Sequence, residues 1–168
     1  VEFKTSPRTE IQYYENNDGL PTPSKLDSII IKDVNNNRLK AYKFSYTYFN
    51  GTGDDIRLKL DSVAESGSDG TVKPPYSFSY FNPNSLPPKY TKAVDHWGYY
   101  NGHATTTLLP SFVAPGSNLP FTGADRSPDT IQYYLMNGVL SSISYPTGGK
   151  TSFEYELHDY SNLHGEQA

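Results

Sequence analysis

The sequence predicts an all-β protein, and three observations support that prediction. Of the 168 residues 15 are Tyr, and aromatic residues make up 14% of the chain. Tyrosine suits a half-buried pleated surface, because its ring packs against neighbours while its hydroxyl reaches water. The 13 Gly and 13 Pro interrupt the chain in the way that turns between strands do. No stretch keeps the 3.6-residue apolar period of an amphipathic helix, whereas several alternate with a period of two.

One pattern occurs three times along the chain. The first copy reads Leu26-Asp27-Ser28-Ile29 and then Tyr42-Lys43-Phe44-Ser45-Tyr46. The second copy reads Leu60-Asp61-Ser62-Val63 and then Tyr76-Ser77-Phe78-Ser79-Tyr80, so each of its positions lies 34 residues after the corresponding one. The third copy, residues 138–155, has a shorter turn, Pro146-Thr147-Gly148-Gly149, and its second strand ends Phe153-Glu154-Tyr155. A strand, a turn and a strand repeated in this way predict consecutive hairpins, at about residues 26–49, 56–82 and 131–158.

Alternation justifies the individual strands. In residues 41–49, aromatic rings occupy every second position and polar side chains most of the positions between them. In residues 56–61, Ile and Leu alternate with charged side chains in the same way. The turns at residues 35–37 and 66–70 are rich in Asn and Gly, which tolerate the left-handed conformation that a tight reversal needs.

A conflict with regular strand alternation recurs inside the pattern. In each copy Leu and the following Ile or Val lie three residues apart, as Leu60 and Val63 do. On a regular strand, side chains three residues apart point to opposite faces of the sheet. Two alternatives follow: both faces are covered at this point, or a β-bulge resets the alternation.

Further segments flank the hairpins. Residues 1–5 and 11–14 are expected to be short strands, the first being the end of a hairpin that starts upstream. The chain begins without Met, so we expect a fragment of a longer protein. Residues 131–134 repeat the Ile-Gln-Tyr-Tyr of residues 11–14 and lead into the third hairpin. A Pro- and Gly-rich insertion spans about residues 83–130, and we expect it to cover one face of the sheet with aromatic rings.

Composition and charge exclude several classes of function. The net charge is −4 and the Lys and Arg residues are scattered, so no basic face for nucleic acid or an anionic membrane is expected. The chain has no Cys, which excludes disulfides, thiolate catalysis and cysteine metal ligands. No apolar run approaches the roughly 20 residues of a membrane-spanning helix. We therefore expect no membrane insertion and no cofactor.

Two motifs carry a resemblance to a known family. The third copy has a set of matching residues, Gly138, Leu140, Ile143, Pro146, Gly148, Gly149, Phe153 and Tyr155. With these residues it resembles the YD repeat of the RHS family. The segment Asp95-His96-Trp97-Gly98-Tyr99-Tyr100-Asn101-Gly102, taken with residues 145–149, is similar more narrowly to the region ahead of the RHS core in large Bacteroidetes surface proteins.

The resemblance implies a long secreted or surface-attached protein of a Gram-negative bacterium. Hairpins of such a protein continue into a spiral or shell, which in the wider family encloses a toxin or acts in adhesion. This chain departs from the family because its first two copies lack the Tyr-Asp pair and the Gly-Gly turn. It also lacks a core cleavage signature and a toxin domain, so no catalytic residue carries over.

The insertion contains the candidate binding residues. Trp97, Tyr99 and Tyr100 are typical of a sugar-binding platform, since the C–H faces of a pyranose pack on flat rings. The alternative, which we favour, is that these rings form a plug that is buried against the sheet.

Polar residues beside the rings suggest a second kind of site. Asp95, His96 and His103 are residue types of a metal site or an acid–base pair, but the two His lie seven apart, which matches no familiar ligand spacing. We favour the interpretation that Asp95 and His96 bind local backbone and fix the loop. We predict no metal site.

Two acidic turns resemble the start of a calcium loop. One combines Asp33 with Asn35 and Asn37, and the other contains Asp54 and Asp55. Neither is followed by the glycine and the distant bidentate carboxylate of an EF-hand. We therefore interpret them as turn residues.

The predicted fold is an antiparallel structure of about eight to ten strands, built from consecutive hairpins in one twisted or partly wrapped sheet. The alternative is a closed two-sheet sandwich of carbohydrate-binding type. The predicted function is non-catalytic: a shell or stalk segment of an extracellular or cell-surface repeat protein, whose partners are neighbouring repeats of the parent chain. The alternative function is a glycan-binding module with polysaccharide as its partner, which uses Trp97, Tyr99, Tyr100, His96 and Asp95. No convincing set of catalytic residues is present, so we do not expect an enzyme.

Overall fold

The computed structural model describes residues 1–8, 23–50, 55–113, 115–116, 120–129 and 132–157. Within these ranges the protein is all-β, as predicted, and contains nine strands and no α-helix. No helix in this part of the chain is therefore long and apolar enough to cross a membrane.

The chain divides into two compact units, and each is considered by itself. Unit 1 comprises Val1–Lys89 and Gly138–Phe153. Unit 2 comprises Tyr90–Asn137 and, among the described residues after the last strand, residues 154–157. The unit formed by the insertion thus runs from residue 90 to residue 137, where the sequence suggested 83–130. The covering of the sheet by the insertion stays a prediction.

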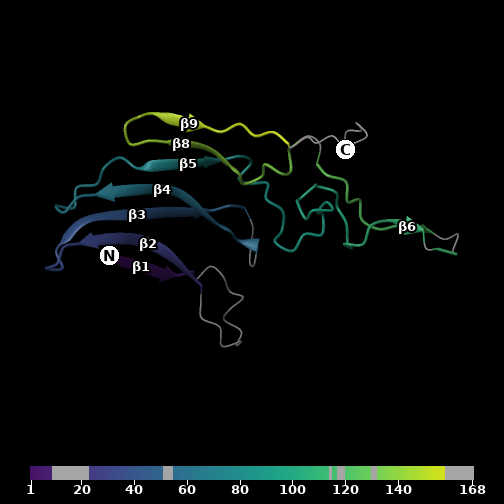
Figure 1. Cartoon of the computed structure of the whole chain (residues 1–168), viewed down its shortest axis with the longest axis horizontal. Helices are drawn as coiled ribbons and strands as arrows, with labels where there is room; N and C mark the ends of the chain where they lie inside the picture. Colours follow the sequence, from purple (N-terminus) through teal and green to yellow (C-terminus); the bar gives the residue numbers. More distant parts are fainter. Residues whose placement is uncertain (9–22, 51–54, 114, 117–119, 130–131, 158–168) are drawn as a thin grey trace, which may run out of the picture. The chain divides into compact units, whose positions relative to one another are not determined.

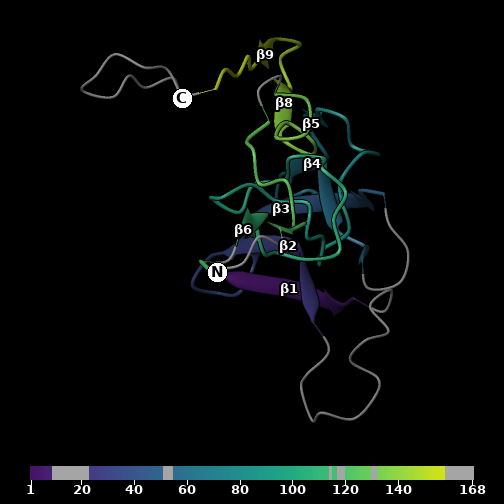
Figure 2. The same ribbon diagram turned by 90° about the vertical axis from the view of Figure 1, so that its right-hand side faces the viewer.

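Unit 1 is built on one seven-stranded antiparallel sheet (Figure 1). Its strands are β1 (Glu2–Pro7), β2 (Ser24–Lys32), β3 (Arg38–Tyr48), β4 (Leu58–Ser66), β5 (Tyr76–Tyr80), β8 (Leu140–Ser144) and β9 (Lys150–Ser152). They lie in this order across the sheet, and the insertion enters between β5 and β8. Figure 2 shows the strand direction turning from β1 to β8, which is the expected sheet twist. The described strands of unit 1 form this single sheet, with β1 and β9 at its edges, and not the alternative sandwich.

The three predicted hairpins are present as neighbouring strand pairs: β2 with β3, β4 with β5, and β8 with β9. The strand expected at residues 1–5 corresponds to β1. Residues 132–138 form turns rather than a strand, so the third hairpin begins only at β8. The strand expected at residues 11–14 lies outside the described residues.

A β-bulge interrupts the alternation at the same place in all three copies. The bulged residue follows the Leu of the pattern directly, and it is Asp27 in β2, Asp61 in β4 and Ser141 in β8. Such a residue adds one position to its own strand without a partner on the neighbouring strand. A feature that recurs at one position of the repeat belongs to the repeat itself.

The bulge explains how Leu and the following Ile or Val, three residues apart, can lie on the same face of the sheet. Residues that lie opposite each other on neighbouring strands share a face of the sheet. In β3, Phe44 lies opposite Val63 and Tyr46 lies opposite Leu60. Because Phe44 and Tyr46 are two positions apart, both lie on one face, and so do Val63 and Leu60. The second of the two alternatives, a bulge that resets the alternation, is confirmed.

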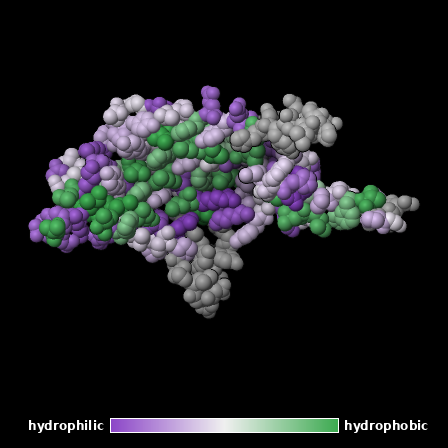
Figure 3. Space-filling view, viewed as in Figure 1, coloured by the Kyte–Doolittle hydropathy of each residue, from purple (hydrophilic) through white to green (hydrophobic). Residues whose placement is uncertain are grey.

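The two faces of the sheet differ in chemistry. One face is aromatic and aliphatic, and across the strands it carries Phe3, Ile29, Tyr42, Phe44, Val63, Tyr76, Phe78 and Ile143. The other face carries a row of serines in which each lies opposite the next: Ser45, Ser62, Ser77 and Ser144. Hydrophobic residues gather over the strands of unit 1 (Figure 3). We call these the aromatic face and the serine face.

The sheet has little core of its own. Among the described residues of unit 1, Ala41 is the one apolar residue that is buried, with 6% of its surface exposed. Most side chains of β2 and β4 are half-buried, whichever face they belong to. The sheet is therefore held together chiefly by its backbone ladder and by contacts between neighbouring strands.

The three hairpin turns share one backbone geometry. In residues 33–37, 67–71 and 145–149, the first N–H donates to the fifth carbonyl and the fourth N–H donates to the first carbonyl. The fourth residue has a positive φ in each case: 66° at Asn36, 83° at Gly70 and 90° at Gly148. This is the three-residue hairpin loop in which a left-handed residue follows a type I turn, so Asn or Gly is favoured there.

The acidic turn at Asp33 is a turn of this kind. The Asp33 carboxylate accepts the N–H groups of Asn35 at 2.9 Å and Asn37 at 2.8 Å, and the Asn37 side-chain amide at 3.0 Å. These bonds, of which the side-chain bond from Asn37 has the largest effect, lower the pKa of Asp33. The interpretation as turn chemistry is confirmed here. Asp55 differs, because it accepts the amide of the distant Lys89 at 2.7 Å, and Asp54 lies outside the described residues.

Unit 2 is mostly irregular. Its two short strands, β6 (Phe112–Val113) and β7 (Pro120–Phe121), pair antiparallel. Its described buried residues are mainly polar: Ala93, Asp95, Asn101, Ala124 and Asp129. Buried polar groups need hydrogen-bond partners, so these residues define how the unit is held together.

Candidate functional site

The candidate binding residues lie on a small hairpin in unit 2, residues 94–100, which we call the aromatic turn. Val94 and Tyr100 form an isolated antiparallel bridge. Between them the Asp95 N–H donates to the Tyr99 carbonyl at 2.8 Å, and the Gly98 N–H donates to the Asp95 carbonyl at 3.2 Å. Gly98 has a φ of 93°. The aromatic turn is thus a fourth copy of the turn geometry found in the sheet.

Asp95 fixes the backbone of the aromatic turn. Its carboxylate accepts the N–H groups of Trp97 and Tyr99, each at 2.9 Å, and the residue is only 2% exposed. Asp33 makes the corresponding two bonds in the β2–β3 turn. The interpretation that Asp95 binds local backbone is therefore confirmed. His96 is exposed and makes no hydrogen bond within the described ranges, so that interpretation does not hold for His96.

Arg126 holds the aromatic turn from outside. Its Nε donates to the Asp95 carbonyl oxygen at 2.9 Å, and its Nη2 donates to the same oxygen. Its Nη1 donates to the Leu108 carbonyl at 2.8 Å. Three donors of one planar guanidinium therefore join two loop segments. No local sequence pattern predicts this role, because the contact spans 31 positions.

Asn101 occupies the centre of unit 2 and is 1% exposed. Its side-chain nitrogen donates to the carbonyl oxygens of Asp125 at 3.1 Å and Ser127 at 2.8 Å, and its side-chain oxygen accepts the His103 N–H at 3.1 Å. Asn101 thus ties the aromatic turn to residues 125–127. Sequence reasoning assigned this residue no role, because its two carbonyl partners lie more than twenty positions away.

Gly102 lies close against the ring of Tyr134 in unit 2. A Cβ atom on Gly102 would lie 2.3 Å from the Tyr134 ring, and Gly102 has a φ of 73°. Tyr134 packs edge-on against Tyr100, with ring centroids 5.4 Å apart. Asp129 in turn accepts the Tyr134 N–H at 2.7 Å, which positions that ring. Only glycine meets both the conformation and the space at position 102.

The aromatic turn sorts the candidate rings into two groups. Trp97 and Tyr99 are 65% and 63% exposed. Tyr100 is half-buried against Tyr134, and burial raises the pKa of its hydroxyl. Within unit 2, therefore, Tyr100 is partly buried, whereas Trp97 and Tyr99 present their rings to solvent. Burial of these rings against the sheet stays a prediction.

The acid–base or metal site suggested by Asp95, His96 and His103 is not assembled. The Asp95 carboxylate is bound to two backbone amides, while His103 Nδ1 lies 3.1 Å from Asp125 Oδ2. Since both side-chain N–H groups of Asn101 point at carbonyls, His103 Nδ1 is the donor to Asp125. The pKa of Asp125 is lowered, mainly by the hydrogen bond from the Ser127 backbone amide. The charge of His103 and its hydrogen bond lower this pKa further. The described ranges contain no cluster of three or more His, Cys, Asp or Glu that could hold a metal.

No protein-family model, curated protein or solved structure matches this chain. The resemblance to YD repeats therefore stays a prediction that is carried by the sequence motifs.

Proposed function

We propose that this chain is a non-catalytic structural segment of a larger YD-repeat-like protein at the bacterial cell surface, in which neighbouring repeats extend its sheet. The register of the repeat is the observation that supports the proposal. The Phe of one hairpin lies opposite the Ile or Val of the next in three places: Phe3 with Ile29, Phe44 with Val63, and Phe78 with Ile143. The pairing between hairpins is thus as regular as the pairing within them.

The edge strand β9 has the sequence of a strand that is paired in this way. Phe153 and Tyr155 follow it at the positions that Phe44 and Tyr46 occupy in the first copy. The Phe153 N–H donates inward to the Ser141 carbonyl at 2.9 Å. Because backbone groups alternate in direction along a strand, those of Ser152 point to the open edge. An edge of this kind is a template for one further strand.

A peptide with the sequence of β2, residues 24–32, tests the proposal, because it carries the Leu, Ser and Ile of the pattern. We expect it to bind the complete chain and to shift the NMR signals of β9. Ser152→Pro removes an outward N–H without touching a bond to β8, so it should abolish binding while leaving the sheet folded.

A register control makes this test specific. A peptide of the same composition with the Leu and Ile moved by one position should bind much more weakly, since the shift turns them to the other face. Equal binding of both peptides, or undiminished binding to Ser152→Pro, would contradict the proposal.

The aromatic turn supports a second candidate function, glycan binding. Two large exposed rings, Trp97 and Tyr99, lie on a turn whose backbone is fixed by Asp95 and Arg126. Rigid exposed rings lose little conformational entropy on binding, which suits a stacking platform. His96, at the tip of the same turn, is also exposed and available for a hydrogen bond to a sugar hydroxyl.

Trp97 is the single Trp of the chain, so its fluorescence reports on this site directly. A neutral soluble glycan that binds should shift the emission to the blue and protect Trp97 from acrylamide. Calorimetry should show that Trp97→Ala abolishes binding, whereas Tyr90→Ala, which removes a 79% exposed ring elsewhere in unit 2, leaves it unchanged. Unchanged emission with every glycan of a broad panel would rule out this function.

A further inference from the structure

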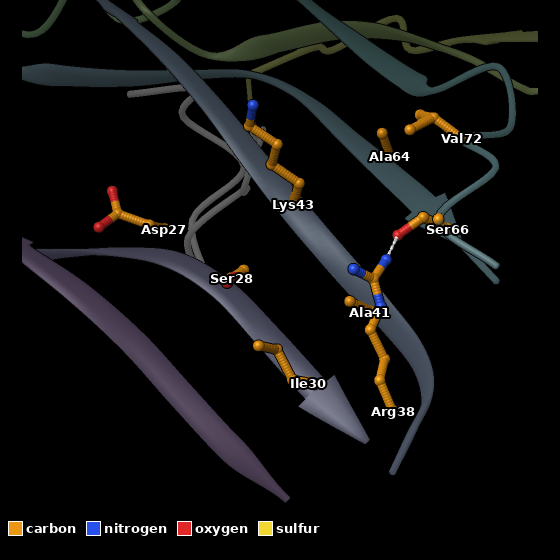
Figure 4. Close-up of a pocket in the computed structure, with 10 residues that line it drawn as sticks. Asp27, Ser28, Ile30, Arg38, Ala41, Lys43, Ala64, Ser66 and Val72 are labelled. Carbon is orange, nitrogen blue, oxygen red and sulfur yellow. Dashed lines mark hydrogen bonds between the residues drawn. The ribbon is translucent and has the colours of Figure 1, made fainter. Parts of the chain in front are cut away.

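The serine face of unit 1 has a hollow of about 320 Å³ over strands β2, β3 and β4 (Figure 4). Its floor consists of Ala41 and Ala64, whose side chains are too short to fill the space between their longer neighbours. Ala41 lies opposite Ser66, and Ala64 lies opposite Lys43. The hollow is therefore a direct result of small residues at paired positions of neighbouring strands.

The charges in the hollow differ from those in the rest of this part of the sheet. Strands β1 to β4 contain seven basic side chains, and five of them pair with carboxylates: Lys4, Lys25, Lys32, Lys40 and Lys59. The two without such a pair are Arg38 and Lys43, and both line the hollow. Arg38 donates to the Ser66 hydroxyl, as Figure 4 shows, and makes no ion pair. The pKa of the nearby Asp69 is lowered mainly by the side-chain hydrogen bond from Thr71, and the charge of Arg38 adds to this effect. In a chain of net charge −4, two cations without an ion pair in one hollow are an exception that indicates an anionic ligand.

One carboxylate, that of Asp27, also lines the hollow. It lies 2.6 Å from Lys25 Nζ and accepts a hydrogen bond from Ser6 at 2.9 Å. The hydrogen bond from Lys25 is the main cause of its lowered pKa, so Asp27 stays ionised near neutral pH. Its charge is thus balanced by Lys25, and it does not neutralise Arg38 or Lys43.

We infer that the hollow binds a carboxylate-bearing polysaccharide, a polyuronate, along the serine face. Along the backbone of β3, Arg38 and Lys43 lie about four regular strand steps apart, or about 13 Å, because Leu39 is an extra residue that adds no step. A compact anion such as phosphate would engage one of them, whereas a chain with repeated carboxylates reaches both. The hydroxyls of Ser28 and Ser66 lie beside the cations and both donate and accept hydrogen bonds, as sugar hydroxyls require.

The serine row extends this surface beyond the hollow. Ser45, Ser62, Ser77 and Ser144 lie side by side across four strands of the same face. An acidic peptide would add its own backbone at a sheet edge and would have little use for a row of hydroxyls on a face. A hydroxyl-rich chain is the better match, and it is the ligand that we propose. This site shares no residue with the aromatic turn and does not depend on extension of the sheet.

Calorimetry with polygalacturonate oligomers and the complete chain tests the inference. We expect saturable binding that weakens with added salt, because exposed charges are screened. Lys43→Gln should weaken binding by about three- to tenfold, since one charge-assisted contact is lost. Asp27→Asn should strengthen it, because the negative charge in the hollow is removed. Lys40→Gln is the matched control: Lys40 lies in the same strand as Lys43 but opposite Ile31, on the aromatic face and outside the hollow.

The outcomes are distinct. Loss on Lys43→Gln with no change on Lys40→Gln or Trp97→Ala supports the site. Equal loss with Lys43→Gln and Lys40→Gln would mean unspecific attraction between charges and would overturn it. Undiminished binding of the fully methyl-esterified oligomer would also overturn it, because the carboxylates would then not be recognised. Preference for polyglutamate over polygalacturonate would replace the saccharide by an acidic peptide and would equally overturn the proposal.

Discussion

The hydroxyl of Tyr80 donates a 2.7 Å hydrogen bond to the backbone carbonyl oxygen of Leu60. One repeat earlier, Tyr46 makes the same bond to Leu26 at 2.9 Å. In both cases the accepting Leu directly precedes the bulged Asp, where the backbone ladder is locally disrupted. The Tyr hydroxyl therefore supplies a donor at the point where the bulge disturbs regular pairing. Burial is the main cause of the raised pKa of both tyrosines.

Tyr80→Phe should lower the free energy of unfolding by about 1 kcal/mol, because it removes one hydrogen bond and leaves the Leu60 carbonyl without this donor. Tyr46→Phe should have a similar effect through Leu26. Urea denaturation followed by far-ultraviolet circular dichroism measures both changes.

Tyr76→Phe is the control for this pair. Tyr76 lies in the same sheet, is 43% exposed, and its hydroxyl makes no hydrogen bond in the ranges that the structure describes. Its loss should change the free energy of unfolding by a few tenths of a kcal/mol at most. A loss as large as that of Tyr80→Phe would mean that removal of the hydroxyl alone, and not the bond to Leu60, causes the effect.

Deletion of Asp61 should disrupt the sheet far more than its substitution. Without the bulged residue, the register of β4 can be kept on only one side of the deletion, and either Leu60 or Val63 turns to the serine face. We expect the deletion variant to lose cooperative unfolding. Asp61→Ala keeps the bulge and loses only exposed contacts to Thr47 and Lys59, so it should cost less than about 1 kcal/mol. Calorimetric unfolding of both variants distinguishes register from side-chain chemistry.

Much of the sheet could be predicted from its sequence. Alternation and the 34-residue offset predicted β2 to β5, because half-buried strands have a period of two and a repeat must fold in the same way each time. The bulge was only one of two alternatives. The sequence shows that Leu60 and Val63 do not fit one regular alternation, but it does not show how the strand accommodates them. Pairing with Phe44 and Tyr46 decides it, and that is a contact between strands.

Unit 2 was harder to predict, for a physical reason. The role of Asp95 follows from local spacing, because an Asp three residues before a Gly forms the same turn as Asp33 before Asn36. Arg126 and Asn101 act on residues more than twenty positions away, and no local pattern reports such contacts. The third hairpin was expected from about residue 131, but residues 132–138 form turns, where Asp129 accepts the Tyr134 N–H.

Edge strand β1 should loosen in acid through Glu2. The Glu2 carboxylate pairs with Lys32 at 2.8 Å and also with Lys4, and these contacts, the Lys32 hydrogen bond first, lower its pKa to about 2. A lowered pKa stabilises the folded form above the ordinary value of 4.5, and this stabilisation disappears as the pH falls through about 2. Hydrogen exchange of the β1 amides should therefore accelerate between pH 4.5 and pH 2, relative to β3.

Glu2→Gln removes the titrating group and provides the control. In this variant the protection of β1 relative to β3 should be lower at neutral pH and should not change further over the same acid range. A carboxyl of Glu2 that titrates near 4.5 by NMR would show that its ion pairs do not persist in solution.

Gly102→Ala should destabilise unit 2 selectively. The new methyl would lie 2.3 Å from the Tyr134 ring, at a φ of 73° that side chains disfavour, so the ring or the backbone must move. Gly98→Ala introduces similar backbone strain, at a φ of 93°, but its methyl would meet no atom within 4 Å. We expect a loss of about 1 kcal/mol for Gly98→Ala and clearly more than about 3 kcal/mol for Gly102→Ala.

Trp97 lies in unit 2 and is the only Trp, so thermal unfolding followed by its fluorescence reads this difference, while circular dichroism follows the sheet. The double variant Gly102→Ala with Tyr134→Ala separates the two sources of strain. Removal of the ring should recover part of the loss, because only the unfavourable φ would remain. If both glycine variants were equally destabilised, backbone strain alone would explain the loss, and the packing of Tyr134 on Gly102 would not be what holds the aromatic turn in place.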